Sequence, residues 1–227
     1  MRLQTLLGWV SVLALPSLLW ATAYNEMDVV DLQGTIMVQH AKASSTPTAL
    51  MTGSTIEKGD TLTCYEKSWV ILKTHSGARV GLDGLNGPTV VNVDEFYLEG
   101  PDRQIRLVLQ QGVIFLKTNG YGSKQSFFEI NTGSVVTSVN DTQARLAFSP
   151  SDTSLTVQYF TGDLSVIDKD HEEKMLVNHC ERHWKNGTMA EKDPSPVDDI
   201  DWINYKKFFN SEPRVAPGDN NFLLTGS

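Results

Sequence analysis

Four glycines mark places where the alternation of apolar and polar residues shifts by one position. A strand with one buried face carries apolar side chains at every second residue. In the segment IRLVLQQGVIFLK, an apolar residue lies three positions before Gly112 and another lies two positions after it, which breaks that period. The same shift surrounds Gly133 and Gly162, and more weakly Gly34. Because glycine tolerates the positive φ that tight turns and bulges require, we expect these glycines at turns and corners of a β-sheet.

The spacing of these glycines is uneven, whereas a solenoid would keep a fixed period. No apolar pattern of helical period and length occurs between residues 24 and 180. The pattern therefore predicts an all-β domain over residues 27–182. We expect a sandwich or roll of short, mostly antiparallel strands, followed by a C-terminal helix.

The C-terminal part is predicted as a linker over residues 183–195, a helix over 196–209 and a flexible tail over 210–227. Ser195 suits the N-cap and Pro196 the first helical position. Acidic residues near the helix start and lysines near its end match the helix dipole.

The apolar side chains of this helix invite two interpretations. We expect the helix to dock on the β domain through Ile200, Ile203 and an aromatic residue, and the alternative is an exposed face that binds a partner. The aromatic residues that would form that face are Trp202, Tyr205, Phe208 and Phe209.

The first 23 residues resemble a secretory leader. Arg2 precedes an apolar run, and the run ends in the small-residue pattern Ala21-Thr22-Ala23. This pattern predicts cleavage before Tyr24 and export, with no transmembrane segment in the mature chain. An uncleaved membrane anchor is the alternative.

The composition excludes some classes of binding partner from those expected. The 227-residue chain has a formal net charge of −8, and no cluster of basic residues is visible along it. Nucleic acid and anionic lipid surfaces are therefore not expected as partners. The two cysteines, Cys64 and Cys180, could form a disulfide after export or could stay as two buried thiols.

The best metal candidate is the segment NHCERH, which contains His179, Cys180 and His183. Histidines four residues apart could share one face and bind zinc, but Cys180 stands where a zinc protease would have its general-base glutamate. A fourth ligand would have to come from elsewhere in the chain, for example His171 or Cys64. Surface histidines without a metal are the alternative, and we expect no metal.

No other motif indicates catalysis or a cofactor. Gly81, Gly84 and Gly87 recur at three-residue intervals, but strands are expected on both sides and Pro88 follows at once. A phosphate cradle needs a helix after the loop, so a connection between strands is favoured. No nucleophile elbow occurs, and we expect neither a catalytic residue nor a cofactor.

Taken in order, these segments resemble the FecR domain over roughly residues 54–180. The opening GDTLTCYEKSWVILKTHSGARVGLDG is similar to the start of that family, and IRLVLQQGVIFLK, FFEINTGSVVTSV and LTVQYFTGDLSVID are similar to its later segments. The family's R-G-T-x-F segment is reduced to Thr142 and Phe148 in VNDTQARLAF. The cytosolic anti-sigma part and transmembrane helix of its signalling members are not expected in this chain.

The resemblance implies a stand-alone exported domain in the bacterial periplasm or outside the cell. It favours a non-catalytic module that interacts with or senses an envelope protein or polymer. The first alternative is a zinc- or carboxylate-dependent hydrolase of envelope polymers. The second is a passive structural component of a surface assembly.

Overall fold

The computed structural model describes residues 26–41, 46–98, 103–119, 126–168, 172–175, 179–190, 195–196 and 199–210. The predicted leader, the tail beyond Asn210 and His171 lie outside these residues. The strands are β1 (Glu26–Gln33), β2 (Ile36–Gln39), β3 (Thr48–Ala49), β4 (Thr55–Glu57), β5 (Thr61–Cys64), β6 (Trp69–Thr74), β7 (Arg79–Asp83), β8 (Thr89–Tyr97), β9 (Gln104–Lys117), β10 (Phe127–Asn131), β11 (Val136–Ser149), β12 (Ser154–Ile167), β13 (Glu172–Met175), β14 (Cys180–Lys185), β15 (Thr188–Met189) and β16 (Ser195–Pro196). The helix is α1 (Asp199–Phe209).

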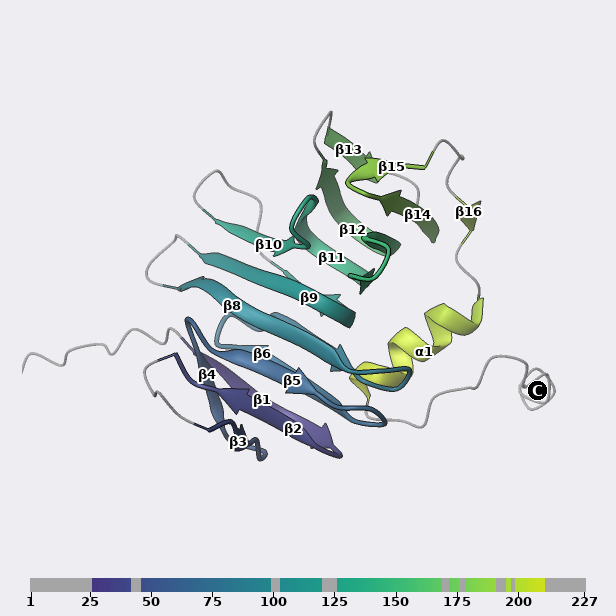
Figure 1. Ribbon diagram of the computed structural model, residues 1–227. Coiled ribbons are helices and arrows are strands. Elements are labelled where there is room, and N and C mark those ends of the chain that lie inside the picture. The colour runs from purple at the N-terminus through teal and green to yellow at the C-terminus, as the bar shows by residue number, and fades with distance from the viewer. Residues whose placement is uncertain are drawn as a thin grey trace, which may run out of the picture.

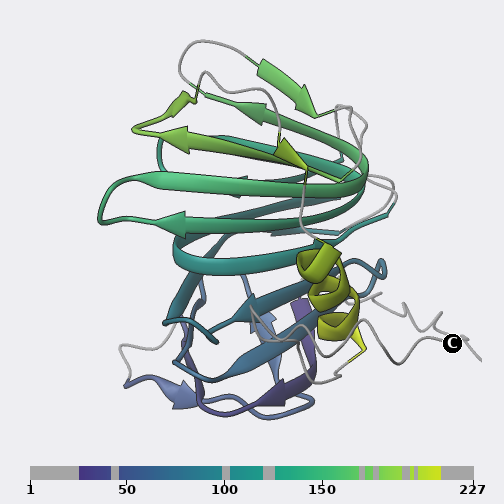
Figure 2. The same cartoon turned by 90° about the vertical axis from the view of Figure 1, so that its right-hand side faces the viewer.

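The strands form two layers (Figures 1 and 2), and buried apolar side chains from both layers make one core. The first layer pairs β3, β2, β5, β8, the start of β9, β10, the start of β11, the end of β12 and β13. The second layer pairs β4, β1, β6, β7, the end of β9, the end of β11, the start of β12, β14 and β15. Among these pairs only β9 and β10 run parallel. The predicted all-β roll of mostly antiparallel strands is thus confirmed.

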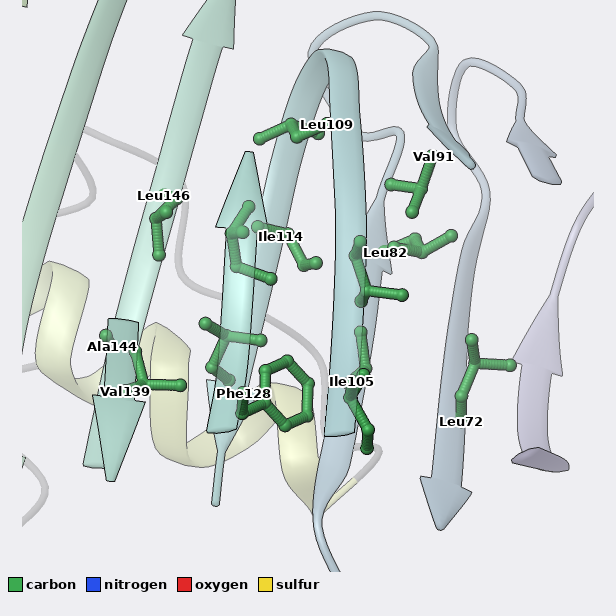
Figure 3. Packing of buried hydrophobic residues seen from close by; sticks show 14 of the residues in the cluster. Leu72, Leu82, Val91, Ile105, Leu109, Ile114, Phe128, Val139, Ala144 and Leu146 are labelled. Carbon is green, nitrogen blue, oxygen red and sulfur yellow. The ribbon is translucent and has the colours of Figure 1, made fainter. Parts of the chain in front are cut away.

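Three strands are longer than expected because each belongs to both layers. β9, β11 and β12 each have 14 residues. Residues 104–111 of β9 pair with β8, whereas residues 113–117 pair with β7 and β11. Figure 3 shows β9 arching over, with Ile105 on one arm and Ile114 on the other. The shift of apolar period keeps both arms facing the same interior.

Gly112 lies at the bend of β9 with φ of 92°. A Cβ atom at this position would lie 2.1 Å from Oγ1 of Thr89. That hydroxyl donates to the carbonyl of Asp83 at 2.6 Å and accepts from the amide of Val113 at 2.8 Å. Gly112 is therefore required both by its backbone conformation and by the closeness of β8.

The other glycines also occupy bends or turns. Gly162 bends β12, and Gly34 joins β1 of the second layer to β2 of the first. Gly133 lies instead in the hairpin turn between β10 and β11, where its amide donates to Oδ1 of Asn131 at 2.7 Å. The glycines of residues 81–87 lie in β7 and in the connection to β8, so the strand-connection interpretation of that segment is confirmed.

The predicted linker over residues 183–195 is wrong for its first part, because strands of the sheet occupy residues 183–185 and 188–189. β14 runs to Lys185, and Lys185 pairs with Thr188 of β15. The two residues between them, Asn186 and Gly187, have φ of 52° and 74°. Positive φ at both central residues defines a two-residue hairpin turn that Asn-Gly favours. The Asn186-Gly187 dipeptide is therefore the sequence signal for this hairpin, which the predicted linker overlooked.

The helix begins later than predicted. Ser195 and Pro196 were expected at its start, but they form β16 and pair with Glu181 and Cys180. Proline is compatible with such an edge position because no further strand needs its missing N–H. α1 starts at Asp199, and the described part of the chain contains no helix long and apolar enough to cross a bilayer.

Candidate functional site

The outer face of the second layer carries both the helix and a connected set of polar contacts. Ile71 and Phe115 are buried there although they point away from the shared interior, because α1 lies over them. Figure 2 shows α1 against this layer. The strands under the helix are consequently buried on both faces, which explains the unbroken apolar run in β6.

The helix docks through aromatic side chains. Tyr205, Phe208 and Phe209 are buried against Phe115 and Phe160. Phe208 stacks on Phe115 with ring centroids 4.5 Å apart, and Tyr205 lies 4.7 Å from Phe160. Aromatic pairs at these separations add to the free energy of simple burial. Docking of the helix on the β domain is therefore confirmed.

Two contacts fix the position of the helix. A Cβ atom on Gly81 would lie 2.0 Å from Cε1 of Phe208, so the ring fits only because residue 81 has no side chain. The hydroxyl of Tyr205 donates to the carbonyl of Leu116 at 2.7 Å. Burial raises the pKa of Tyr205 well above its ordinary value, because the phenolate would lose its hydration.

The alternative that this aromatic face binds a partner is wrong for three of its four residues. Tyr205, Phe208 and Phe209 are at most 8 % exposed and are covered by the sheet. Ile203, expected to carry the docking, is only half-buried and lies outside the aromatic cluster. The side chains of Ile200 and Trp202 lie outside the described residues. Phe208 can lie directly against β7 because Gly81 has no side chain.

A polar ladder extends across β11, β12 and β14 from Arg145, which lies over the ring of Phe115. We use this name for Arg145, Thr156, Gln158, Glu181 and His183. Nη1 of Arg145 donates to Oε1 of Gln158 at 3.1 Å, and Nε2 of Gln158 donates to Oε2 of Glu181 at 2.6 Å. Nε2 of His183 lies 2.8 Å from Oε1 of Glu181, and its Nδ1 lies 3.0 Å from Oγ1 of Thr156. The strand register places all five residues on neighbouring strands.

The polar ladder joins a hydroxyl, an imidazole and a carboxylate, the elements of an activated nucleophile. Because the carboxylate of Glu181 faces Nε2 of His183, neutral His183 carries its proton there and accepts from Thr156 through Nδ1. Yet the side chain of His183 is 53 % exposed on an outer sheet face, and Gln158 occupies the second oxygen of Glu181. Nucleophilic catalysis also needs donors for an oxyanion and exclusion of water.

The strand separates the residues proposed as metal ligands. Successive side chains of β14 point to opposite faces, so buried Cys180 faces the interior while His183 faces outward. His179 precedes the strand with φ of 57° and lies edge-on to Phe160 at 6.4 Å. Over the described ranges, no three His, Cys, Asp or Glu side chains gather as a metal site requires. The sequence interpretation did not find the polar ladder, because its members come from three strands.

Cys64 and Cys180 are both buried thiols and are not bonded to each other. Cys64 lies in β5 of the first layer and Cys180 in β14 of the second. Their strands, β5 and β14, do not pair with each other in the sheet. The structure thus corresponds to the second of the two alternatives, two buried thiols.

The polar residues that carry the FecR resemblance stabilise the fold. Asp60, of the opening Gly-Asp pair, is buried and accepts from the amide of Glu57 at 3.0 Å and from Nδ1 of His40 at 3.0 Å. Thr142 lies at the bend of β11, where its hydroxyl donates to the carbonyl of Asp163 on β12. Its amide donates to Oγ1 of Thr118 at 3.1 Å. These residues hold loops and corners in place.

Comparison with known proteins supports the fold. Neither a protein-family model nor a curated protein sequence matches this chain. Two crystal structures of a candidate anti-sigma factor from Parabacteroides distasonis, at 1.65 and 2.50 Å resolution, match with TM-scores of 0.50 and 0.51. Each match has 13% sequence identity and covers 65% of this chain and 64% of the other. At this identity the likeness concerns the fold alone.

Proposed function

We propose that this protein is an exported, non-catalytic interaction or sensing module of the FecR type, which binds a protein partner in the bacterial envelope. The observation that carries the proposal is the all-β roll, whose fold is similar to that of a candidate anti-sigma factor. In this roll the residues of the resemblance, Gly112, Asp60 and Thr142, hold corners and loops in place. Such a scaffold presents a rigid outer surface, which suits recognition.

The experiment is expression of the full chain in a bacterium, followed by intact-mass measurement and capture of partners from the envelope fraction. Export predicts a mature protein that begins at Tyr24. A sensing module predicts one envelope protein captured in stoichiometric amount. Retention of residues 1–23 would contradict the proposed processing, and a mature protein that captures nothing under cross-linking would contradict the proposed role.

The hydrolase alternative has one specific observation in its favour, the chain of contacts from Thr156 through His183 to Glu181. It predicts release of soluble fragments from envelope polymers and loss of that release in His183→Gln. Asp152, at the nearby β11–β12 turn, provides a matched control when changed to Asn. Equal behaviour of the wild type and His183→Gln would leave the binding role as the better account.

A further inference from the structure

Three cations lie side by side on the outer face of the second layer. Lys73 of β6 pairs with Arg79 of β7, and Arg79 pairs with Lys117 of β9. All three side chains point away from the interior, because their neighbours Leu72, Val80 and Leu116 are buried. We call these three residues the cationic row. With adjacent strands about 4.8 Å apart, the row spans about 10 Å.

No ion pair within the described ranges involves the cationic row. Asp28 of β1 lies opposite Lys73 in the register, but the two do not form an ion pair. Like charges directly opposite one another on neighbouring strands destabilise a sheet. The row is therefore an unfavourable arrangement in a chain whose net charge is −8, where carboxylates are abundant. A chain that keeps three cations together under these conditions has a surface suited to an external anion.

The position of the row makes it a pre-formed surface. The adjacent row on the same strands, Ile71, Gly81 and Phe115, lies under α1. The helix therefore borders the cationic row along one side, and Arg79 is half-buried. An arginine held in this way loses less conformational freedom on binding a carboxylate than a fully exposed one does.

We propose that the cationic row is the docking site for an acidic peptide segment of the protein partner. The row is straight and lies on an outer sheet face. An extended peptide repeats its side chains on one face every 6.6–6.8 Å or so, so two or three carboxylates span the row. Phosphate sites, by contrast, are typically built from backbone N–H groups at helix N-termini or in nests. The charge complementarity here comes from side chains alone, which suits carboxylates on a peptide laid across the strands.

The test uses the full mature chain and a fluorescent oligoglutamate peptide, with an oligophosphate of equal charge as the second probe. Lys73→Gln and Lys117→Gln are each expected to weaken peptide binding about two- to fivefold, and added salt weakens it further. Lys58→Gln is the matched control, because it changes net charge equally but its ammonium is paired with Glu95 at 2.8 Å. Loss of mutual repulsion predicts that Lys73→Gln and Lys117→Gln keep or raise the melting temperature.

Several results would overturn the inference. They are no peptide binding by the wild type at low salt, equal weakening by Lys58→Gln, tighter binding of the oligophosphate, and a fall in melting temperature that accompanies lost binding. The inference rests on the proposed function in one respect, namely that the ligand is a segment of a protein partner. Failure to bind the synthetic peptide would overturn the docking site alone. Capture of partners from the envelope fraction tests the proposed function separately.

Discussion

The contact between Gly81 and Phe208 allows a quantitative test of how α1 is held. Gly81→Ala would place a Cβ atom 2.0 Å from the Phe208 ring, which Phe115 stacks against at 4.5 Å. The ring must shift, and overpacking of this kind costs about 1–3 kcal/mol. In a chain of this size that corresponds to a fall in melting temperature of about 2–12 °C. Urea unfolding followed by far-UV circular dichroism measures the loss directly.

A double-mutant cycle separates this contact from a general effect of alanine in β7. Phe208→Ala alone should cost up to about 3–5 kcal/mol, limited by the free energy of docking. In that background Gly81→Ala should cost less than about 0.5 kcal/mol, because nothing remains to clash with. Phe209→Ala is the matched control, since Phe208 supplies the atoms nearest to Gly81 and the clash persists. Equal costs of Gly81→Ala in all backgrounds would refute the reasoning.

Three further outcomes are expected. Gly112→Ala should lower the free energy of unfolding, measured in urea, by about 2 kcal/mol or more. Gly53 has a similar φ of 85° but no atom within 4 Å of a built Cβ, so Gly53→Ala should lose only the free energy of the strained backbone conformation. Equal losses would contradict the role of β8. Burial raises the pKa of Tyr205, so its neutral phenol stabilises the fold at pH values below the ordinary tyrosine pKa of about 10. The melting temperature should therefore fall as the pH rises above about 10. This fall should be smaller in Tyr205→Phe, which has no phenol to ionise. Asp60→Ala should lose about 1–3 kcal/mol in thermal unfolding, and a neutral result would mean that its contacts to Glu57 and His40 contribute little.

Local patterns account for what the sequence predicted correctly. Alternation of period two, broken at Gly112 and Gly162, identifies strands and their bends, because it depends only on neighbouring residues and on the φ that glycine permits. The aromatic and acidic–basic pattern near residue 200 likewise identified a helix. Its start was misplaced because the choice between helix and β16 depends on pairing with β14, where Ser195 pairs with Glu181 and Pro196 pairs with Cys180.

The surfaces that bear on function were decided by the tertiary structure. Lys73, Arg79 and Lys117 are scattered along the sequence, so no basic cluster was visible, yet cross-strand register places them side by side. The polar ladder arises in the same way from β11, β12 and β14. The contact between Gly81 and Phe208 likewise joins residues that lie far apart in the sequence. Register and layer packing are collective properties, because each strand must satisfy both neighbours and the shared interior at once. The sequence alone determined the strands, the bends and the presence of a helix, whereas which side chains meet on the outer face was settled only when the strands paired.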